Sequence, residues 1–302
     1  MPFISIIMLL MLGAIWGASF PFIKLSLESF DPATIVAFRL AGASVVLYLV
    51  MRWQRHRLPR GWRVWRDMLV VGNVGMVLPF LLITWGELHI SSSLAAIIVA
   101  TTPLFTLLLA FVWLRSESLG WLRSIGVLLG FSGVLVAIGI NDANLADAGT
   151  WGELAVIGAA LCYAITALYA RRAFKDMAPL VPATGTMLAG TLTIVPLAFG
   201  MDGLPTMQPT ANALLGLVGL TLLSTAMAYI LYYWILDKLG APRATMVTYL
   251  IPSFALIYGW LWLQETIGWD TFVGLLLVFA GIIIANGVPR LRRRPTVAAD
   301  TP

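Results

Sequence analysis

The sequence predicts an all-α integral membrane protein with ten transmembrane helices, built as two inverted five-helix repeats. Three observations predict this fold: the composition, the spacing of long apolar segments, and a stretch of sequence that occurs twice. The 302-residue chain is 60% hydrophobic and 11% charged, with a mean hydropathy of +0.92. Soluble domains carry about 25% charged residues, and one core cannot hide so much apolar surface. In lipid each backbone polar group needs a partner within its own segment, so the apolar segments must be helices.

Ten apolar segments have the length of a membrane span, since about 20 helical residues cross about 30 Å of hydrocarbon. The short connections between them predict that neighbouring helices pack antiparallel. Residues 290–302 form a polar tail that we expect to be disordered. The predicted spans are residues 3–24, 32–51, 67–86, 91–114, 118–140, 151–171, 178–199, 211–236, 240–263 and 269–288.

Lysine and arginine collect in alternate connections, which orients the chain because positive charge stays on the cytoplasmic side. With a cytoplasmic N-terminus, the inner connections hold clusters such as the six arginines between residues 52 and 66, whereas the outer connections hold Lys24 and several acidic residues. We therefore expect both termini in the cytoplasm. Residues 1–25 are interpreted as a retained first span and not a signal peptide, because no basic residue precedes the apolar run.

A stretch at the end of the fourth predicted span recurs at the end of the ninth. A shift of 148 positions aligns Glu117 with Glu265, and ten of the 25 positions from Arg115 to Gly139 become identical. Composition explains matched leucines but not a matched glutamate and matched, spaced glycines, so we interpret the stretch as part of an internal repeat. The predicted repeats are residues 1–145 and 146–289. Each holds five spans, an odd number, so the second must cross the membrane in the opposite sense, as in many transporters.

Several motifs together resemble a known family. The first span carries Trp16-Gly17-Ala18-Ser19-Phe20, the second carries Arg39 followed by small residues, the fourth and ninth carry a mid-span proline and a terminal glutamate, and the fifth and tenth carry spaced glycines. This pattern resembles the drug/metabolite transporter superfamily, specifically the EamA family of ten-helix exporters. The resemblance implies an inner-membrane exporter of amino acids or related metabolites. It also implies a central cavity lined by helices 1–4 and 6–9, with helices 5 and 10 as outer supports.

Arg39 is the charged residue that the prediction places well inside a span. A charge there is costly, which makes it a functional candidate. Its guanidinium could bind a substrate carboxylate. Alternatively, the side chain could extend outward to the surface or pair with an outer acid such as Glu87 or Glu265.

The other candidates for a substrate pocket are polar and aromatic residues predicted near the middle of the membrane. A transport pocket needs apolar walls with a few converging polar groups, and aromatic faces can also receive an ammonium group. Ordinary core packing is the alternative for each residue alone, and we expect roughly half of the set to line a cavity at the interface between the repeats. The candidates are Trp16, Phe20, Asn73, Phe80, Thr101, Thr102, Tyr163, Thr166, Tyr229 and Tyr249.

Pro103 and Pro252 lie at matching positions of the two repeats. Proline removes a backbone donor and frees the carbonyl four residues earlier, so both are candidate hinges that shape the cavity. The glycines of the fifth and tenth spans are predicted to serve close helix packing. Glu117 and Glu265 are predicted to cap the helix that follows each of them, where a carboxylate meets free N–H groups.

The sequence also argues against several kinds of chemistry. One cysteine, Cys162, and two histidines cannot form a metal cluster, and we expect no cofactor. There is no phosphate-binding glycine loop. The basic residues lie between spans and not on a folded polar face, so no nucleic-acid partner is expected. No acidic residue or histidine is predicted at the middle of the membrane, where proton-driven transporters often carry a relay. Proton antiport would need a peripheral acid or Arg39, and uniport or exchange is the alternative.

These observations predict a secondary transporter that exports small metabolites, above all amino acids, by alternating access. Its partners are then a small-molecule substrate and the lipid bilayer, and a monomer is compatible with the sequence. Efflux of organic cations or aromatic drugs is the alternative within transport. A membrane enzyme is the alternative from another class, but it would need an ionisable cluster at the level of the lipid headgroups, which the sequence does not offer.

Overall fold

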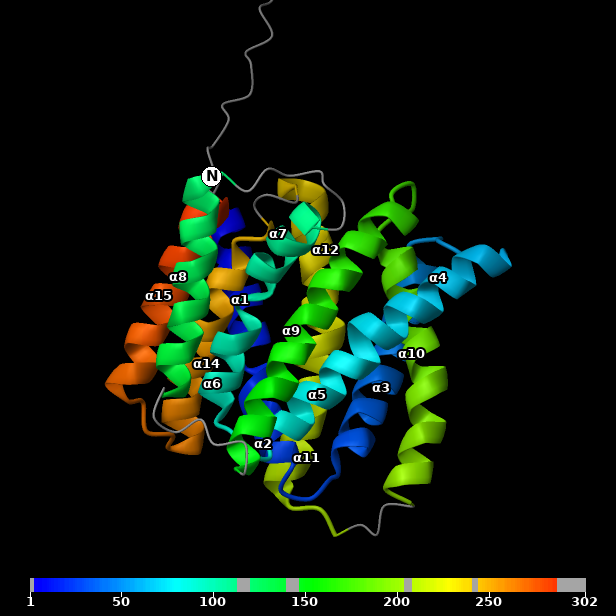
Figure 1. Cartoon of the computed structure of the whole chain (residues 1–302). Helices are drawn as coiled ribbons and strands as arrows, with labels where there is room; N and C mark the ends of the chain where they lie inside the picture. The colour runs from blue at the N-terminus through cyan, green and yellow to red at the C-terminus, as the bar shows by residue number, and fades with distance from the viewer. Residues whose placement is uncertain (1–2, 113–119, 140–146, 204–207, 241–243, 287–302) are drawn as a thin grey trace, which may run out of the picture.

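We describe a computed structural model of the chain, covering residues 3–112, 120–139, 147–203, 208–240 and 244–286. Throughout these ranges the regular structure is helical, and the helices form one bundle (Figure 1). The elements are α1 (Phe3–Gly17), α2 (Ser19–Ser26), α3 (Pro32–Trp53), α4 (Trp62–Gly72), the π-helical η1 (Asn73–Val77), α5 (Leu78–Gly86), α6 (Ser92–Val99), α7 (Thr102–Val112), α8 (Trp121–Ile138), α9 (Ala148–Ala173), α10 (Leu180–Met201), α11 (Ala211–Val218), the π-helical η2 (Gly219–Met227), α12 (Ala228–Leu239), α14 (Val247–Leu263) and α15 (Trp269–Asn286).

The bundle has the dimensions and the surface of a membrane protein. Among the described residues, eight helical segments are long and apolar enough to span a membrane, and α14 and α15 are shorter apolar helices. Four tryptophans are exposed at helix ends, where indole rings anchor a protein at the lipid interface: Trp53, Trp62, Trp121 and Trp269. The prediction of an all-helical membrane protein is thus confirmed, and several predicted boundaries shift by a few residues. The third span begins at Trp62 and not at residue 67, because hydropathy falls at Arg63 and Arg66 whereas helical hydrogen bonding continues through them.

Two spans predicted as continuous helices are interrupted. The first breaks at Ala18, between α1 and α2, and the fourth breaks between α6 and α7. Hydroxyl groups next to the breaks bond to backbone carbonyls and so compete with the helical ladder. Ser19 Oγ donates to the carbonyl of Trp16 at 2.6 Å, and Thr102 Oγ1 donates to that of Val99 at 2.7 Å. Pro103 cannot donate to Val99, so the Thr102 hydroxyl supplies the missing hydrogen bond.

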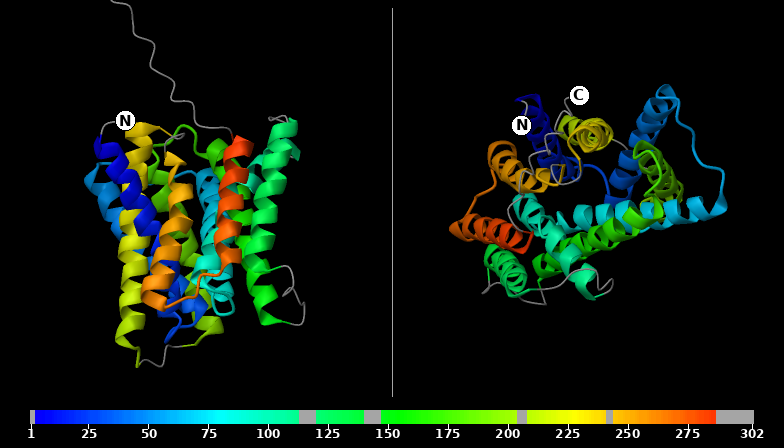
Figure 2. Two further views of the ribbon diagram at one scale, coloured as in Figure 1. Left: turned by 90° about the vertical axis from the view of Figure 1, so that its left-hand side faces the viewer. Right: turned by 90° about the horizontal axis from the view of Figure 1, so that it is seen from above.

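The elements of the two predicted repeats are interleaved. In each of three helix pairs that pack together, α1 with α14, α3 with α10 and α5 with α9, one member comes from each half of the chain. In Figure 1, α1 runs downward from the N-terminus and α9 runs upward, so the two helices cross the bundle in opposite senses. The left-hand view of Figure 2 shows the same downward course of α1. The interior of the bundle is therefore shared by both halves, and a site there receives residues from both.

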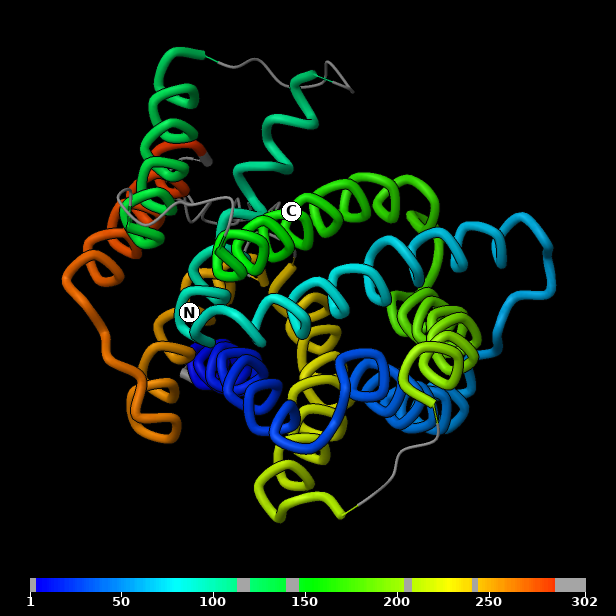
Figure 3. The backbone as a smooth tube through the Cα atoms, turned by 60° about the horizontal axis from the view of Figure 1, so that its bottom comes forward, coloured from blue at the N-terminus to red at the C-terminus, as the bar shows by residue number. Residues whose placement is uncertain are grey.

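The glycine-bearing helices α8 and α15 pack together at one edge of the bundle, as Figure 3 shows. A Cβ atom added at Gly133 would lie 2.7 Å from the carbonyl oxygen of Gly274, and one added at Gly281 would lie 2.4 Å from the amide nitrogen of Gly130. Only glycine permits so close an approach of two backbones. The predicted packing role of these glycines is confirmed.

Candidate functional site

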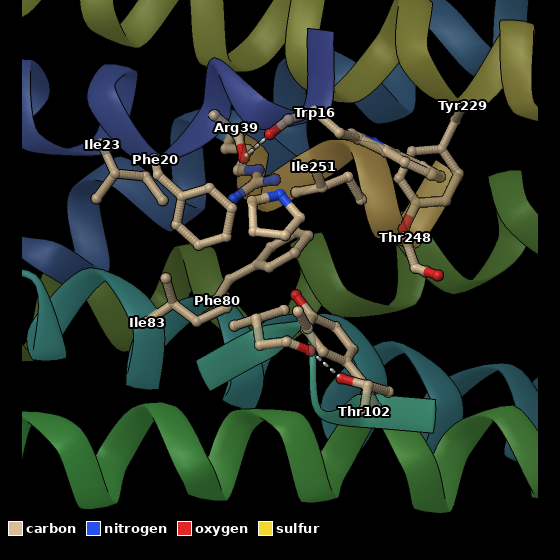
Figure 4. A pocket seen from close by; sticks show the side chains of 15 residues that line it. Trp16, Phe20, Ile23, Arg39, Phe80, Ile83, Thr102, Tyr229, Thr248 and Ile251 are labelled. Atoms are coloured by element: carbon tan, nitrogen blue, oxygen red, sulfur yellow. Dashed lines mark hydrogen bonds between the residues drawn. The ribbon is translucent and has the colours of Figure 1, made fainter. Parts of the chain in front are cut away.

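A cavity of about 240 Å³ lies inside the bundle where the two halves meet (Figure 4). Its walls come from α1, α2, α3, α5, α6, α7, α9, α12 and α14, whereas the edge helices α8 and α15 do not reach it. The seventh predicted span, α10, was expected to contribute, but no described residue of α10 lines the cavity. The lining residues are Trp16, Ser19, Phe20, Ile23, Arg39, Phe80, Ile83, Val99, Ala100, Thr102, Tyr163, Tyr229, Thr248, Ile251 and Pro252.

The Arg39 side chain is buried, with 6% of its surface exposed, so it does not extend outward to the surface. Its Nε atom donates to Thr225 Oγ1 at 2.8 Å, and its guanidinium carbon lies 3.7 Å from the centroid of the Phe80 ring. Within the described part of the chain, no carboxylate lies within ion-pair distance of it. The guanidinium is therefore held in place by a hydroxyl and an aromatic face, and its charge has no direct counter-ion.

The π-helical segment η2 places the hydroxyl that holds Arg39. Thr225 Oγ1 itself donates to the carbonyl of Leu220, five residues earlier, at 2.7 Å. Its hydroxyl hydrogen is thereby used, which leaves the oxygen lone pairs to accept from Arg39. π-helical turns widen the helix locally and are frequent at functional sites. The counterpart of η1 under the 148-residue shift is residues 221–225, which lie within η2.

Aromatic rings form one wall of the cavity. Trp16 lies edge-on to Tyr229, with ring centroids 6.1 Å apart, and also contacts Tyr232 at 5.4 Å. Tyr163 faces the cavity from α9. The hydroxyls of Tyr163 and Tyr229 have no hydrogen-bond partner among the described residues, so both can bond to a ligand.

A proline in α14 frees a backbone carbonyl at a residue that lines the cavity. Pro252 lies inside α14, so the carbonyl of Thr248 lacks its usual helical donor. Both residues line the cavity. A carbonyl without its helical donor can accept a hydrogen bond from an ammonium or hydroxyl group of a ligand.

The structure brings together seven of the eleven predicted substrate-binding residues, together with Pro252. The other predicted residues lie elsewhere. Asn73 donates to the carbonyl of Leu69 at 2.8 Å, Thr101 donates to that of Ile98 at 2.6 Å, and Thr166 donates to that of Cys162 at 2.7 Å. Tyr249 contacts Phe279 of α15, and Pro103 lies in the first turn of α7 beside the cavity-lining Thr102. The side chains of Asn73, Thr101 and Thr166 thus bond to backbone carbonyls of their own chain segment, and the polarity of a residue alone does not predict this.

The predicted binding residues left out Ser19 and several aliphatic lining residues. Val99 and Thr248 were predicted only as the residues whose carbonyls Pro103 and Pro252 free for a ligand. Ile23 and Ile83 each follow a predicted residue by three positions, and Ile251 follows Thr248 by three. Side chains three or four residues apart share one face of a helix. This spacing is the signal that would have identified them, once Phe20 and Phe80 had been selected.

Polar contacts join neighbouring helices at the end of the bundle where α2 ends and α3 begins. The ammonium group of Lys24 donates to the carbonyls of Glu87 and Ile90. Asp202, after α10, accepts from both the amide and the hydroxyl of Thr34 at 2.8 Å. These contacts fasten α2 to the α5–α6 connection and α3 to α10.

The contact made by Glu265 corrects its predicted role. Its carboxylate accepts hydrogen bonds from the amides of Ser92 and Ser93 at 2.8 and 3.1 Å, so it caps α6 and not the following helix α15. Gln264, just before it, has a left-handed φ of 54°, which turns the chain toward α6. Glu117, the counterpart of Glu265, lies outside the described residues.

The chain resembles one solved structure in fold and several proteins named as transporters in sequence. One solved crystal structure superposes with a TM-score of 0.67 at 18% identity, covering 92% of this chain and 97% of the other, which shows a shared fold. The relatives include the uncharacterized transporter YoaV of Bacillus subtilis, 25% identical over 89% of this chain and 92% of its own length. The uncharacterized inner membrane transporter YedA of Escherichia coli is 24% identical over 94% of this chain and 91% of its own length.

A further relative carries a more specific name. A probable terminal-alkyne amino-acid exporter of Streptantibioticus cattleyicolor is 30% identical over 95% of this chain and 94% of its own length. The sequence profile of the EamA-like transporter family matches residues 3–139 and 150–287, which together make up most of the chain. The protein is therefore a multi-pass membrane transporter that belongs to the EamA-like transporter family.

Proposed function

We propose that this transporter exports small metabolites, above all amino acids, across the inner membrane as a secondary transporter. The observation that carries the proposal is the guanidinium of Arg39, which borders the cavity without a carboxylate partner. A buried cation of this kind favours an anionic ligand group, because a carboxylate would supply the missing counter-ion in a desolvated site.

The rest of the cavity fits the other groups of an amino acid. The aromatic faces of Trp16 and Tyr229 and the carbonyl of Thr248 can receive its ammonium group. The side chain of the substrate would then contact Phe20 and Ile251. One relative is named as an amino-acid exporter, which supports this substrate class.

The alternative of organic-cation or drug efflux is less well supported. No carboxylate lines the cavity among the described residues, and the positive charge of Arg39 opposes a second cation. The cavity volume of about 240 Å³ is also below the range of about 300–1,000 Å³ that is common for drug-sized ligands.

We further propose that residues 1–145 and 146–289 act as two inverted repeats that open the cavity to one face of the membrane at a time. The opposite senses of α1 and α9 and the matching π-helical segments support this arrangement, which is common in alternating-access transporters. Pro103 and Pro252 would act as hinges. In the proposed orientation both termini are cytoplasmic, and the end closed by Glu265 faces outward. A reporter fused after Arg294 should then be cytoplasmic, and a periplasmic signal would overturn this orientation.

Counterflow in proteoliposomes tests the export proposal. Purified protein is reconstituted with a high internal concentration of one unlabelled amino acid, and entry of the labelled form is followed. We expect accumulation for at least one amino acid, inhibition by related acids, and no accumulation of its amide. If vesicles with protein accumulate no amino acid faster than protein-free vesicles, the proposal fails. Faster accumulation of an aromatic organic cation would instead favour the drug-efflux alternative.

A further inference from the structure

One buried carboxyl group has no use in the site described above. Glu87 follows the last residue of α5, and its side chain is fully buried. Neither carboxyl oxygen has a hydrogen-bond partner among the residues that the structure describes. Four side-chain atoms are buried and unpartnered in the described part of the chain, and all four lie between residues 84 and 92: Thr84 Oγ1, both carboxyl oxygens of Glu87, and Ser92 Oγ. Buried polar atoms without partners are rare, and a cluster of them calls for a ligand that satisfies them.

Among the described residues, none of the charged groups around Glu87 bonds to its carboxyl. Lys24 directs its ammonium group to two backbone carbonyls, one of them that of Glu87 itself. Arg39 bonds to Thr225, and Glu265 accepts from the α6 amides. The histidine on the same connection, His89, packs its ring against Trp85, with centroids 4.8 Å apart. A carboxylate at Glu87 would therefore be buried without a hydrogen-bonded partner, which costs several kcal/mol.

Glu87 also shares a helix face with the cavity. Phe80 and Ile83 line the cavity from α5, and Glu87 follows them by seven and four residues. Residues at this spacing lie along one stripe of a helix, so Glu87 lies one turn, about 5.4 Å, beyond Ile83. The carboxyl thus lies between the cavity and the end of the bundle that Glu265 closes.

We propose that Glu87 is a proton-binding site of this transporter, occupied while this end of the bundle is closed and linked to substrate binding through Arg39. The proton resides on a carboxyl oxygen of Glu87 and is released to water when the carboxyl becomes hydrated. A neutral Glu87 leaves Arg39 available to a substrate carboxylate, whereas an ionised Glu87 competes for it. The linkage between the proton and substrate binding rests on the proposed function. Binding of the proton to Glu87 does not depend on it.

Electrostatics supports the geometric argument. Glu87 lies in the connection between two spans, and burial raises the pKa of its carboxyl well above the ordinary value. Lys24 and Arg39 act in the opposite direction, and Glu265 adds to the rise. The negative end of the α5 dipole, which Glu87 terminates, also disfavours a carboxylate.

Infrared spectroscopy of the full-length protein in detergent tests the proton site directly. A protonated carboxyl gives a carbonyl band distinct from that of a carboxylate. We expect this band in the wild type at neutral pH, its loss in Glu87→Gln, and its retention in Asp176→Asn, which removes an exposed carboxylate. If Glu87→Gln does not fold, the wild type alone decides, because the band should disappear on titration to high pH. A wild type without the band at neutral pH, or a band unchanged in Glu87→Gln, would overturn the proposal.

The linkage to substrate is tested by counterflow at several pH values. In the wild type the apparent substrate affinity should fall above the pKa of Glu87, by at most about tenfold per pH unit, the limit for one proton. The profile should be flatter in Glu87→Gln. Identical profiles in the two proteins would reject the linkage. If no amino acid is carried by either protein, the export proposal fails, and the infrared result still decides the proton site.

Discussion

Glu265 and Ser93 join the two halves of the chain at one end of the bundle. The carboxylate of Glu265, after α14, accepts a hydrogen bond of 2.5 Å from Ser93 Oγ and another of 3.1 Å from the Ser93 amide. The residues are 172 positions apart in the sequence. One side chain therefore satisfies the free amides at the start of α6 and holds α14 beside it, so separation of α6 from α14 must break this contact.

Substitution of Glu265 by glutamine should loosen this end of the bundle. The amides of Ser92 and Ser93 would lose a charged acceptor, which contributes about 1.5–3 kcal/mol in typical cases. Hydrogen exchange of these amides should become at least about tenfold faster, as measured by mass spectrometry in detergent. Asp270→Asn, a change to an exposed acid in the first turn of α15, is the control and should leave α6 unchanged. Equal protection of α6 in Glu265→Gln and wild type would contradict a closing role.

Replacement of Arg39 should impair recognition of the substrate carboxylate. We expect Arg39→Gln to weaken counterflow affinity by about 10- to 100-fold, the value of one charge-assisted interaction. Arg39→Lys should recover only part of it, because lysine keeps the charge but loses the planar contact with Phe80. Arg172→Gln, at an exposed arginine near the end of α9, should have no effect. Wild-type affinity in Arg39→Gln would exclude a carboxylate contact at this residue.

Alanine at the two prolines tests their role as hinges. Pro252→Ala restores the backbone donor for the carbonyl of Thr248 and should straighten α14. We expect several-fold slower counterflow in Pro252→Ala and Pro103→Ala, with unchanged substrate affinity at equilibrium. Pro196→Ala is a matched control, because Pro196 lies inside α10 on the exposed surface. Wild-type rates in both hinge variants would count against any hinge at these positions.

The contact between α8 and α15 should be sensitive to a single methyl group. Gly133→Ala brings a Cβ atom to 2.7 Å from two backbone atoms of α15, which cannot move independently. We expect a loss of about 1–3 kcal/mol, the usual cost of overpacking, seen as a lower melting temperature in detergent. Gly200→Ala is the control, since a Cβ atom there meets nothing within 4 Å. Equal melting temperatures would mean that the two helices can separate at little cost.

The raised pKa of Glu87 predicts how stability depends on pH. Above pH 4.5, the ordinary value, an unfolded chain releases this proton, whereas the folded protein retains it up to the raised pKa. Stability from this group is therefore complete below pH 4.5 and is lost as pH rises toward the raised pKa, by at most about 1.4 kcal/mol per pH unit. Melting temperatures of Glu87→Gln in detergent should fall less steeply with pH than those of the wild type. A steeper fall in the variant would contradict the assigned direction.

Much of the fold could be predicted from the sequence, because apolar segments of span length have few alternatives to helices in a membrane. The helix interruptions could not, although the responsible residues are visible. Thr102 and Pro103 mark the break before α7, but threonine and proline also occur inside continuous helices such as α10, where Pro196 causes no break. Whether a hydroxyl interrupts a helix depends on what neighbouring helices supply, which is a property of the packing.

The sequence predicted the cavity residue with the rarest chemistry in a membrane span, Arg39. It did not predict which of the more common polar residues line the cavity. A buried arginine is costly, so Arg39 stands out in any apolar span. Thr101, Thr166 and Asn73 are also polar residues in spans, but each bonds to its own helix and leaves the cavity to others. A hydroxyl group can find a partner locally, whereas a guanidinium with five donors cannot.

The sequence by itself determined the class of this protein, its helices, its repeated motif and its central arginine. These follow from hydropathy, composition and spacing, which act within one segment. Only the tertiary structure decided that Arg39 meets Thr225 and Phe80 and that Glu265 caps α6. It also decided that the carboxyl of Glu87 is buried without a hydrogen-bond partner among the described residues. The physical reason is that helical periodicity fixes which side chains share a face, whereas the neighbour of that face is chosen by the packing of the whole bundle.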